Sequence, residues 1–276
     1  APTLRMAELF YTQNGLPIDE DLSYEYQDRY SVTPVTASQN LQAQYGSFTA
    51  KLNLDREPRF YSTLGFDRGY NRTWGNLWQL RMKKGETHGR IANSDDYLIS
   101  GYALKKLVHP DSEGDSYSKI VTYAWPIIRL SELYLNYAEA VNEYSGPSSD
   151  AYNALNIVRQ RAGIQSVESA WGDSSISINL NKHTTQEGLR EIIRQERLIE
   201  LSFEGNRYND IRRWKLAEAY FNLPVYGWSV NETTISNYYN ITQVGVRSFN
   251  SPRDYFHPIS INEITINPNL IQNPGW

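Results

Sequence analysis

Residues 189–214, LREIIRQERLIELSFEGNRYNDIRRW, carry the clearest structural signal in this sequence. Apolar residues recur there at spacings that place them on one face of a helix. They are Leu189, Ile192, Ile193, Ile199 and Phe203. Gly205 offers a stop signal. We therefore expect one helix from Glu187 to about Phe203 and a second helix over Tyr208–Tyr220.

Residues 125–163 show the same helical spacing in two parts, separated by Ser145-Gly146-Pro147. A small residue in each part, Ala138 and Ala151, allows two helices to approach closely, as in tetratricopeptide repeats. We expect a helix–turn–helix hairpin of about 34 residues. The sequence holds no second copy of this pattern.

The remaining sequence lacks sustained periodicity, because Gly, Pro and Asn interrupt it every few residues. Residues 1–118 are expected to form a loop-rich region with short strands or loops. Residues 119–221 are expected to form a helical hairpin core, and residues 222–276 a loop-rich C-terminal segment.

Composition excludes several classes of protein. The chain has 276 residues, no cysteine and a formal net charge of −4, so disulfide and thiol chemistry are absent and a nucleic-acid partner is not indicated. Apolar runs are far shorter than the about 20 residues of a membrane-spanning helix. The chain begins with neither a signal peptide nor an initiator Met, so we expect a fragment of a longer protein.

Aromatic residues are frequent, with 21 Tyr and 7 Trp, whereas charged residues are only 21%. Such a chain suits neutral, hydroxyl-rich ligands, because an aromatic ring covers the apolar face of a sugar while amides and Arg bond its hydroxyls. The alternative is that the tyrosines fill core and interface positions.

Residues 70–78, YNRTWGNLW, are the preferred ligand-binding candidate. The segment combines an aromatic platform with hydrogen-bond donors in a loop-like setting. The predicted binding residues are Tyr70, Asn71, Arg72, Trp74, Asn76 and Trp78, with Tyr97, Tyr226 and Trp228 as second-tier candidates. The alternative is that one or both Trp side chains pack the loop onto the helical layer.

Glu196, Glu200 and Glu204 follow one another at four-residue intervals, which places them on one helix face. Carboxylates aligned in this way do not flank a substrate bond as glycosidase residues do. Arginine is abundant nearby and pairs well with carboxylates. We therefore interpret the glutamates as a structural ion-pair network with Arg129 and Arg207, and expect no catalytic residues.

Histidine gives no metal-ligand pattern, since the four His residues are isolated from one another. The sequence has neither a phosphate-binding glycine loop nor a G-x-S-x-G nucleophile motif. We expect no metal and no cofactor.

Three segments together resemble the SusD/RagB family. They are WPIIRLSELYLNYAEA (residues 125–140), the 189–214 stretch quoted above, and the tail from HPI (residues 257–259) to NPNLIQNPGW (residues 267–276). Weaker matches are REPRFY (residues 56–61) and YTQNGLPID (residues 11–19). Their order along the chain is the family's order.

The resemblance implies a mainly α fold of tetratricopeptide-like helical hairpins with long irregular loops and a few short strands, in one domain that lacks its N-terminal half. It implies a lipid-anchored protein on the outer surface of the outer membrane, with the lipid-carrying Cys in the absent half. It implies non-catalytic binding of glycans or other nutrients, with a SusC-like TonB-dependent transporter as partner and residues 1–118 facing the ligand. A helical glycan-degrading enzyme and a protein-binding scaffold remain as alternatives.

Overall fold

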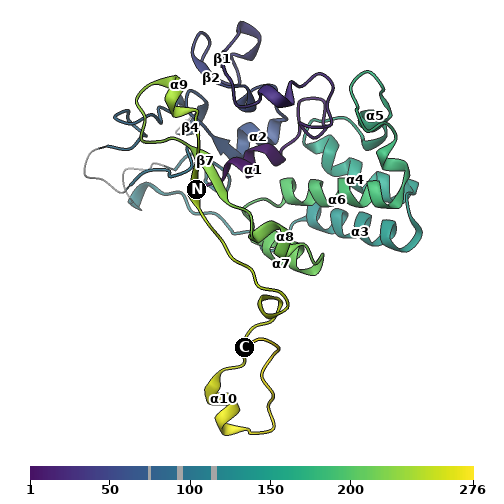
Figure 1. Cartoon of the computed structure of the whole chain (residues 1–276). Coiled ribbons are helices and arrows are strands. Elements are labelled where there is room, and N and C mark those ends of the chain that lie inside the picture. The colour runs from purple at the N-terminus through teal and green to yellow at the C-terminus, as the bar shows by residue number, and fades with distance from the viewer. Residues whose placement is uncertain (74–75, 92–95, 113–116) are drawn as a thin grey trace.

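The protein is built on a layer of three long helices that lie side by side in the computed structural model (Figure 1). The structure describes residues 1–73, 76–91, 96–112 and 117–276. The three helices are α3 (Leu130–Ser145), α4 (Ser149–Arg161) and α6 (Gln186–Glu200), and α3 contacts both others. The predicted hairpin is therefore confirmed, and so is the predicted mainly α fold.

Local sequence explains the hairpin. Gly146 takes a φ of 78°, a left-handed conformation that ends α3 at little steric cost. The Ser148 side chain then caps α4 by accepting a hydrogen bond from the Ala151 backbone N at 3.4 Å. Ala138 and Ala151 are both 0% exposed, as expected for small residues at a close helix contact.

A reciprocal pair of hydrogen bonds ties the end of α3 to the start of α6. Asn142 Nδ2 donates to the Gln186 carbonyl at 2.9 Å, and Gln186 Nε2 donates to the Asn142 carbonyl at 2.7 Å. Asn142 is buried, so this pair satisfies polar groups that water cannot reach. The three helices are thus fixed relative to one another by side chains as well as by apolar packing.

The prediction of one continuous helix over Tyr208–Tyr220 is wrong. The structure has two short helices there, α7 (Asn206–Arg213) and α8 (Ala217–Phe221). Lys215 has a φ of 59°, a left-handed conformation that interrupts the helical path.

Within its described residues, the first part of the chain contains two short α-helices and three antiparallel strand pairs, β1 with β2, β3 with β6 and β4 with β5. Its elements are α1 (Leu4–Leu9), α2 (Pro58–Thr63), β1 (Val32–Pro34), β2 (Phe48–Ala50), β3 (Leu64–Gly65), β4 (Tyr70–Thr73), β5 (Asn76–Gln79) and β6 (Ala103–Leu104). The sequence did not predict α1.

The later part adds α5 (Val167–Gly172), α9 (Ile235–Tyr238), α10 (Ile261–Ile266) and a fourth antiparallel pair, β7 (Val225–Trp228) with β8 (Ile241–Gly245). Beyond β8 the chain packs Phe249 against α7 and α8, and α10 lies at the far end of the arm that projects from there (Figure 1).

A large hydrophobic cluster joins α1 and α2 to the helical layer. Phe10 and Phe60 meet edge to face within it, with ring centroids 5.7 Å apart, and Leu189 on α6 is 0% exposed in the same cluster. In the described ranges, no helix is long and apolar enough to cross a bilayer.

Candidate functional site

The predicted binding segment forms the antiparallel hairpin β4–β5. Asn71 is paired with Trp78, and Arg72 with Leu77. Because successive side chains of a strand point to opposite faces, Asn71 and Trp78 share one face of the hairpin while Tyr70 and Arg72 belong to the other. The predicted residues therefore divide between two faces instead of forming one platform.

Two of the predicted residues cannot be placed. Trp74 lies outside the described residues, and so does the side chain of Asn76, whose backbone begins β5.

Trp78 is half-buried and stacks on His88, with ring centroids 4.9 Å apart and an interplanar angle of 30°. His88 Nδ1 accepts a hydrogen bond from the Arg81 backbone N at 3.1 Å, which assigns the proton of the neutral ring to Nε2. Burial, helped by the charge of Arg81, lowers the pKa of His88. At neutral pH the Trp78 ring is therefore stacked on an uncharged imidazole.

The loop that carries His88 also reaches Tyr97, one of the second-tier candidates, and Asn231 of the later segment. At its end, Arg90 donates a hydrogen bond from Nη1 to Asn231 Oδ1 at 2.5 Å. The same guanidinium group lies 4.8 Å from the centroid of the Tyr97 ring, in cation–π geometry. Lys84 N donates to the Glu232 carbonyl at 3.0 Å and anchors the loop to the later segment. Arg90 and His88 thus link Trp78 to Tyr97 and Asn231.

Neither Arg90 nor His88 was among the residues predicted to bind ligand. They are separated from Trp78 by about ten residues of irregular sequence, and no periodicity indicates which of those residues return to the hairpin.

The base of the hairpin is held by Lys105. Its Nζ donates to the carbonyl oxygens of Tyr70 at 2.7 Å and Tyr61 at 2.5 Å. Burial lowers the pKa of this amine to about 8. Lys105 therefore stabilises the hairpin through two hydrogen bonds, while burial of its charged amine opposes part of that gain.

The other two second-tier candidates differ in access. Trp228 is 1% exposed and packs edge to face against Tyr30 and Tyr239 in the core, where its ring has almost no accessible surface. Tyr226 is 41% exposed and lines a pocket of about 600 Å³ between α1 and the β7–β8 pair.

The three glutamates of the 189–214 stretch are brought together with four arginines from three other segments. Arg129 donates to Glu200 at 2.9 Å and to Glu204 at 2.7 Å, joining the start of α3 to the end of α6. Arg59, from α2, donates to Glu196 at 2.6 Å and to Glu200 at 3.1 Å.

The remaining partners of the three glutamates are Arg159, Arg161 and Lys106. Burial alone would raise the pKa of Glu200, but Arg59, Arg129 and Arg161 outweigh it and hold that pKa below its usual value.

Arg207, which was predicted to belong to this network, lies elsewhere. Its guanidinium group is 5.8 Å from the centroid of the Tyr220 ring. Within the described residues it has no ion pair. Arg207 is the second residue of α7, and its side chain faces α8. The break at Lys215 places α8 on that side of α7, which helical spacing alone did not predict.

Comparison with known proteins finds relatives both by sequence and by structure. SusD-like protein P2 of Formosa agariphila is 35% identical over 150 residues, which cover 54% of this chain and 25% of that protein. The starch-binding protein SusD of Bacteroides thetaiotaomicron is 27% identical over 189 residues, covering 67% of this chain and 26% of that protein. The solved structure of selenomethionine BT4246 matches with a TM-score of 0.80 and 29% identity, over 100% of this chain and 46% of that one.

The chain thus spans about a quarter of the length of the two curated relatives. A model described as the SusD family matches residues 1–276. This chain belongs to the SusD family.

Proposed function

We propose that this chain binds glycans or related nutrients without catalysis and delivers them to a SusC-like TonB-dependent transporter at the outer face of the outer membrane. The family supports this proposal, and one relative is named a starch-binding protein. In the longer protein a lipid anchor would hold the domain at the surface.

The observation that carries the proposal is the Trp78–His88 stack on the β4–β5 hairpin. A half-buried indole ring backed by an imidazole offers a rigid apolar face, the shape that covers one side of a sugar ring. Arg90 at the end of the same loop, with Asn231 and Tyr97 beside it, supplies polar groups for hydroxyls. Residues 1–118 would thus supply most of the ligand-facing surface, 119–221 its helical support and 222–276 the segment that carries Asn231.

A glycan-degrading activity gains little support from the glutamates. Glu196 is 0% exposed and Glu200 3% exposed, and each is already bound by arginine. A general acid must reach the proton acceptor on the substrate, which these buried groups do not. Incubation with soluble glycans and product detection tests this point. Activity that is lost in Glu200→Gln, with the fold intact, would favour the enzyme.

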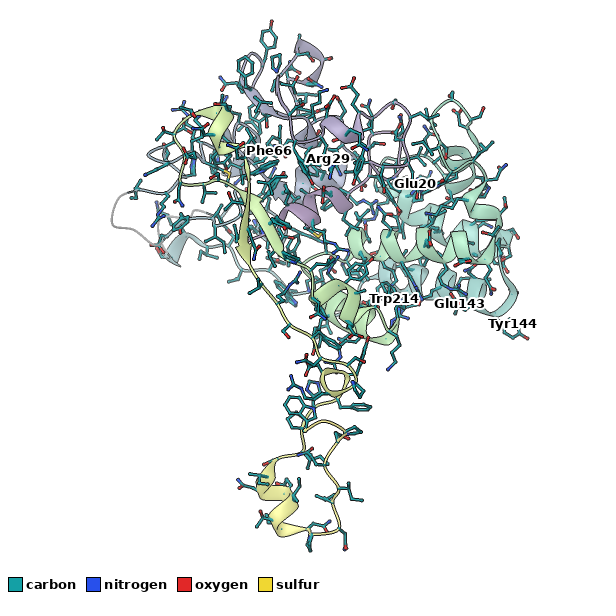
Figure 2. The ribbon with its side chains drawn as sticks, viewed as in Figure 1. Glu20, Arg29, Phe66, Glu143, Tyr144 and Trp214 are labelled. Atoms are coloured by element: carbon teal, nitrogen blue, oxygen red, sulfur yellow. The ribbon has the colours of Figure 1, made fainter. Side chains whose placement is uncertain are left out.

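Isothermal titration against a panel of soluble polysaccharides tests the binding. We expect Trp78→Ala to weaken binding by about tenfold or more, as truncation of an aromatic anchor does. Trp74→Ala is tested in parallel. The matched control is Tyr144→Ala, because Tyr144 is 93% exposed at the end of α3 and points away from the body (Figure 2).

Two results would reject the glycan proposal. One is that no polysaccharide binds, and the other is that binding is the same in Trp74→Ala, Trp78→Ala and Tyr144→Ala. Protein-only binding in the same experiments would favour the scaffold alternative. Co-purification with a SusC-like transporter expressed together with the longer protein tests the delivery step.

A further inference from the structure

A pocket of about 600 Å³ lies between α1 and the β7–β8 pair, apart from the hairpin. Tyr226 and Ile241 line it with accessible apolar surface, since each is more than 40% exposed. Two cationic side chains, Arg5 from α1 and Arg247 from the segment after β8, also line it.

A third arginine lies behind these two. Arg5 and Arg207 both contact the ring of Tyr220, with guanidinium carbons 4.5 Å and 5.8 Å from its centroid. Arg247 lies 5.6 Å from the ring centroid of the neighbouring Phe221. Three guanidinium groups from distant parts of the sequence therefore gather around the aromatic end of α8.

These arginines differ from those of the helical layer in what they contact. In the described part of the chain, Arg5, Arg207 and Arg247 have no carboxylate within ion-pair distance, and Arg207 Nη1 is buried without a hydrogen-bond partner. The pocket does contain Glu8, but Arg29 already donates to it at 2.8 Å and the Tyr30 hydroxyl donates to it as well. The pocket therefore carries net positive charge.

Arg207 lies within the electrostatic influence of both other arginines. Burial, together with the charges of Arg5 and Arg247, lowers the pKa of Arg207 to about 10. An anion placed among these groups would relieve their mutual repulsion and accept charge-assisted hydrogen bonds.

We propose that this pocket binds the acidic group, a carboxylate or a sulfate ester, of a charged saccharide. Arg5 and Arg247 would contact the oxyanion, and Arg207 would add positive charge from behind Tyr220. The exposed ring of Tyr226 would cover a face of the sugar that bears the acid. The inference rests on the proposed glycan binding and adds to it a preference for acidic glycans.

Matched pairs of oligosaccharides test the charge preference by isothermal titration. One pair is oligogalacturonate and its methyl ester, which removes the carboxylate charge from the same backbone. The other is a sulfated carrageenan oligosaccharide and its desulfated form. The two pairs distinguish carboxylate from sulfate as the preferred group. We expect one charged member to bind about tenfold or more tightly than its neutral counterpart, with a preference that falls as salt rises.

Single substitutions test which residues produce the preference for charged saccharides. We expect Arg247→Gln and Arg5→Gln each to remove most of it. Arg247 is exposed, so its replacement leaves the fold intact. Arg190→Gln, at the far end of the helical layer, removes the same charge elsewhere and should retain the preference.

Equal affinity for charged and neutral members would overturn the inference, and so would a preference that survives in both Arg5→Gln and Arg247→Gln. Loss of the preference in Arg72→Gln would assign acid recognition to the hairpin instead. If neutral saccharides bind in a manner that depends on Trp78, the proposed function stands even when this inference fails. If no saccharide of either kind binds, the proposed function fails with it.

Discussion

Arg159 on α4 and Glu196 on α6 form an ion pair with a 3.1 Å separation, and both side chains are 0% exposed. Arg159 also donates to the carbonyl oxygens of Gln165 and Gly15, each at 2.8 Å. The second oxygen of Glu196 accepts from Arg59. One buried guanidinium group thus connects two helices of the layer to the first loop of the chain.

Removing this cation should be costly. In Arg159→Met the two carbonyl groups lose their donor and the buried Glu196 carboxylate loses one of two cations. We expect the free energy of unfolding to fall by about 3–5 kcal/mol, the range for breaking a buried pair. Denaturant titration followed by circular dichroism measures it.

The matched control for this prediction is Arg190→Met. Arg190 donates to Glu143 through two nitrogens, at 2.5 Å and 2.7 Å, but this pair is partly exposed at the surface, and Figure 2 shows Glu143 at the edge of the layer. We expect a loss of only about 0–1 kcal/mol. Equal losses in the two variants would show that burial does not set the cost.

The helical layer could be predicted from sequence because its apolar spacing is unbroken over several turns. The break between α7 and α8 could not, since it depends on the left-handed conformation of Lys215, a residue type without a preference for it. Helix α1 has only six residues, too short for a periodic pattern, and packing against the core stabilises it.

The residue types of the two sites could be predicted from the sequence, but the residues that contact them could not. Helical spacing placed Glu196, Glu200 and Glu204 on one face, yet Arg59 reaches Glu196 from 137 residues away in sequence. The aromatic character of the hairpin likewise gave no sign of His88, which stacks on Trp78. Such contacts depend on the packing of segments that have no common sequence pattern.

Acid should weaken the helical layer partly through Glu200. Its arginine partners hold the folded-state pKa below the usual 4.5. The unfolded chain therefore takes up a proton first as pH falls, and the stability that Glu200 contributes above pH 4.5 is lost below it. We expect Glu200→Gln to be less stable than the wild type at pH 7 and to lose less stability between pH 7 and pH 3.5. Denaturation midpoints across this range measure both effects.

Replacement of Glu218, an exposed carboxylate on α8 without an ion pair in the described residues, is the control for that experiment. Glu218→Gln should follow the pH dependence of the wild type. An unchanged pH dependence in Glu200→Gln would contradict the prediction.

Strand β7 passes so close to Ser100 that Gly227 leaves no room for a side chain. A Cβ at residue 227 would lie 2.6 Å from the Ser100 Cα and 2.8 Å from its carbonyl oxygen. Gly227→Ala must therefore shift backbone, and we expect a loss of about 1–3 kcal/mol. Because the adjacent Trp228 is in the core, its near-ultraviolet circular dichroism should change as well.

Gly245→Ala, in the paired strand β8, is the control for Gly227→Ala. A Cβ at residue 245 would meet the Val225 side chain at 3.7 Å, an ordinary contact, so this variant should keep its stability. Similar losses in both variants would indicate that glycine matters here through chain flexibility instead of space.

Lys105 should make stability rise with pH in mildly alkaline solution. Burial lowers its folded-state pKa to about 8, while the unfolded chain keeps the usual value of 10.5. Between these values the unfolded state binds more protons, so this group adds stability as pH increases.

In Lys105→Met that contribution is absent, so the stability deficit of this variant relative to the wild type should widen from pH 7.5 to pH 9.5. Denaturation midpoints at the two pH values measure the difference. The control is Lys84→Met, because Lys84 is exposed. A constant deficit would mean that the amine keeps its charge beneath the hairpin.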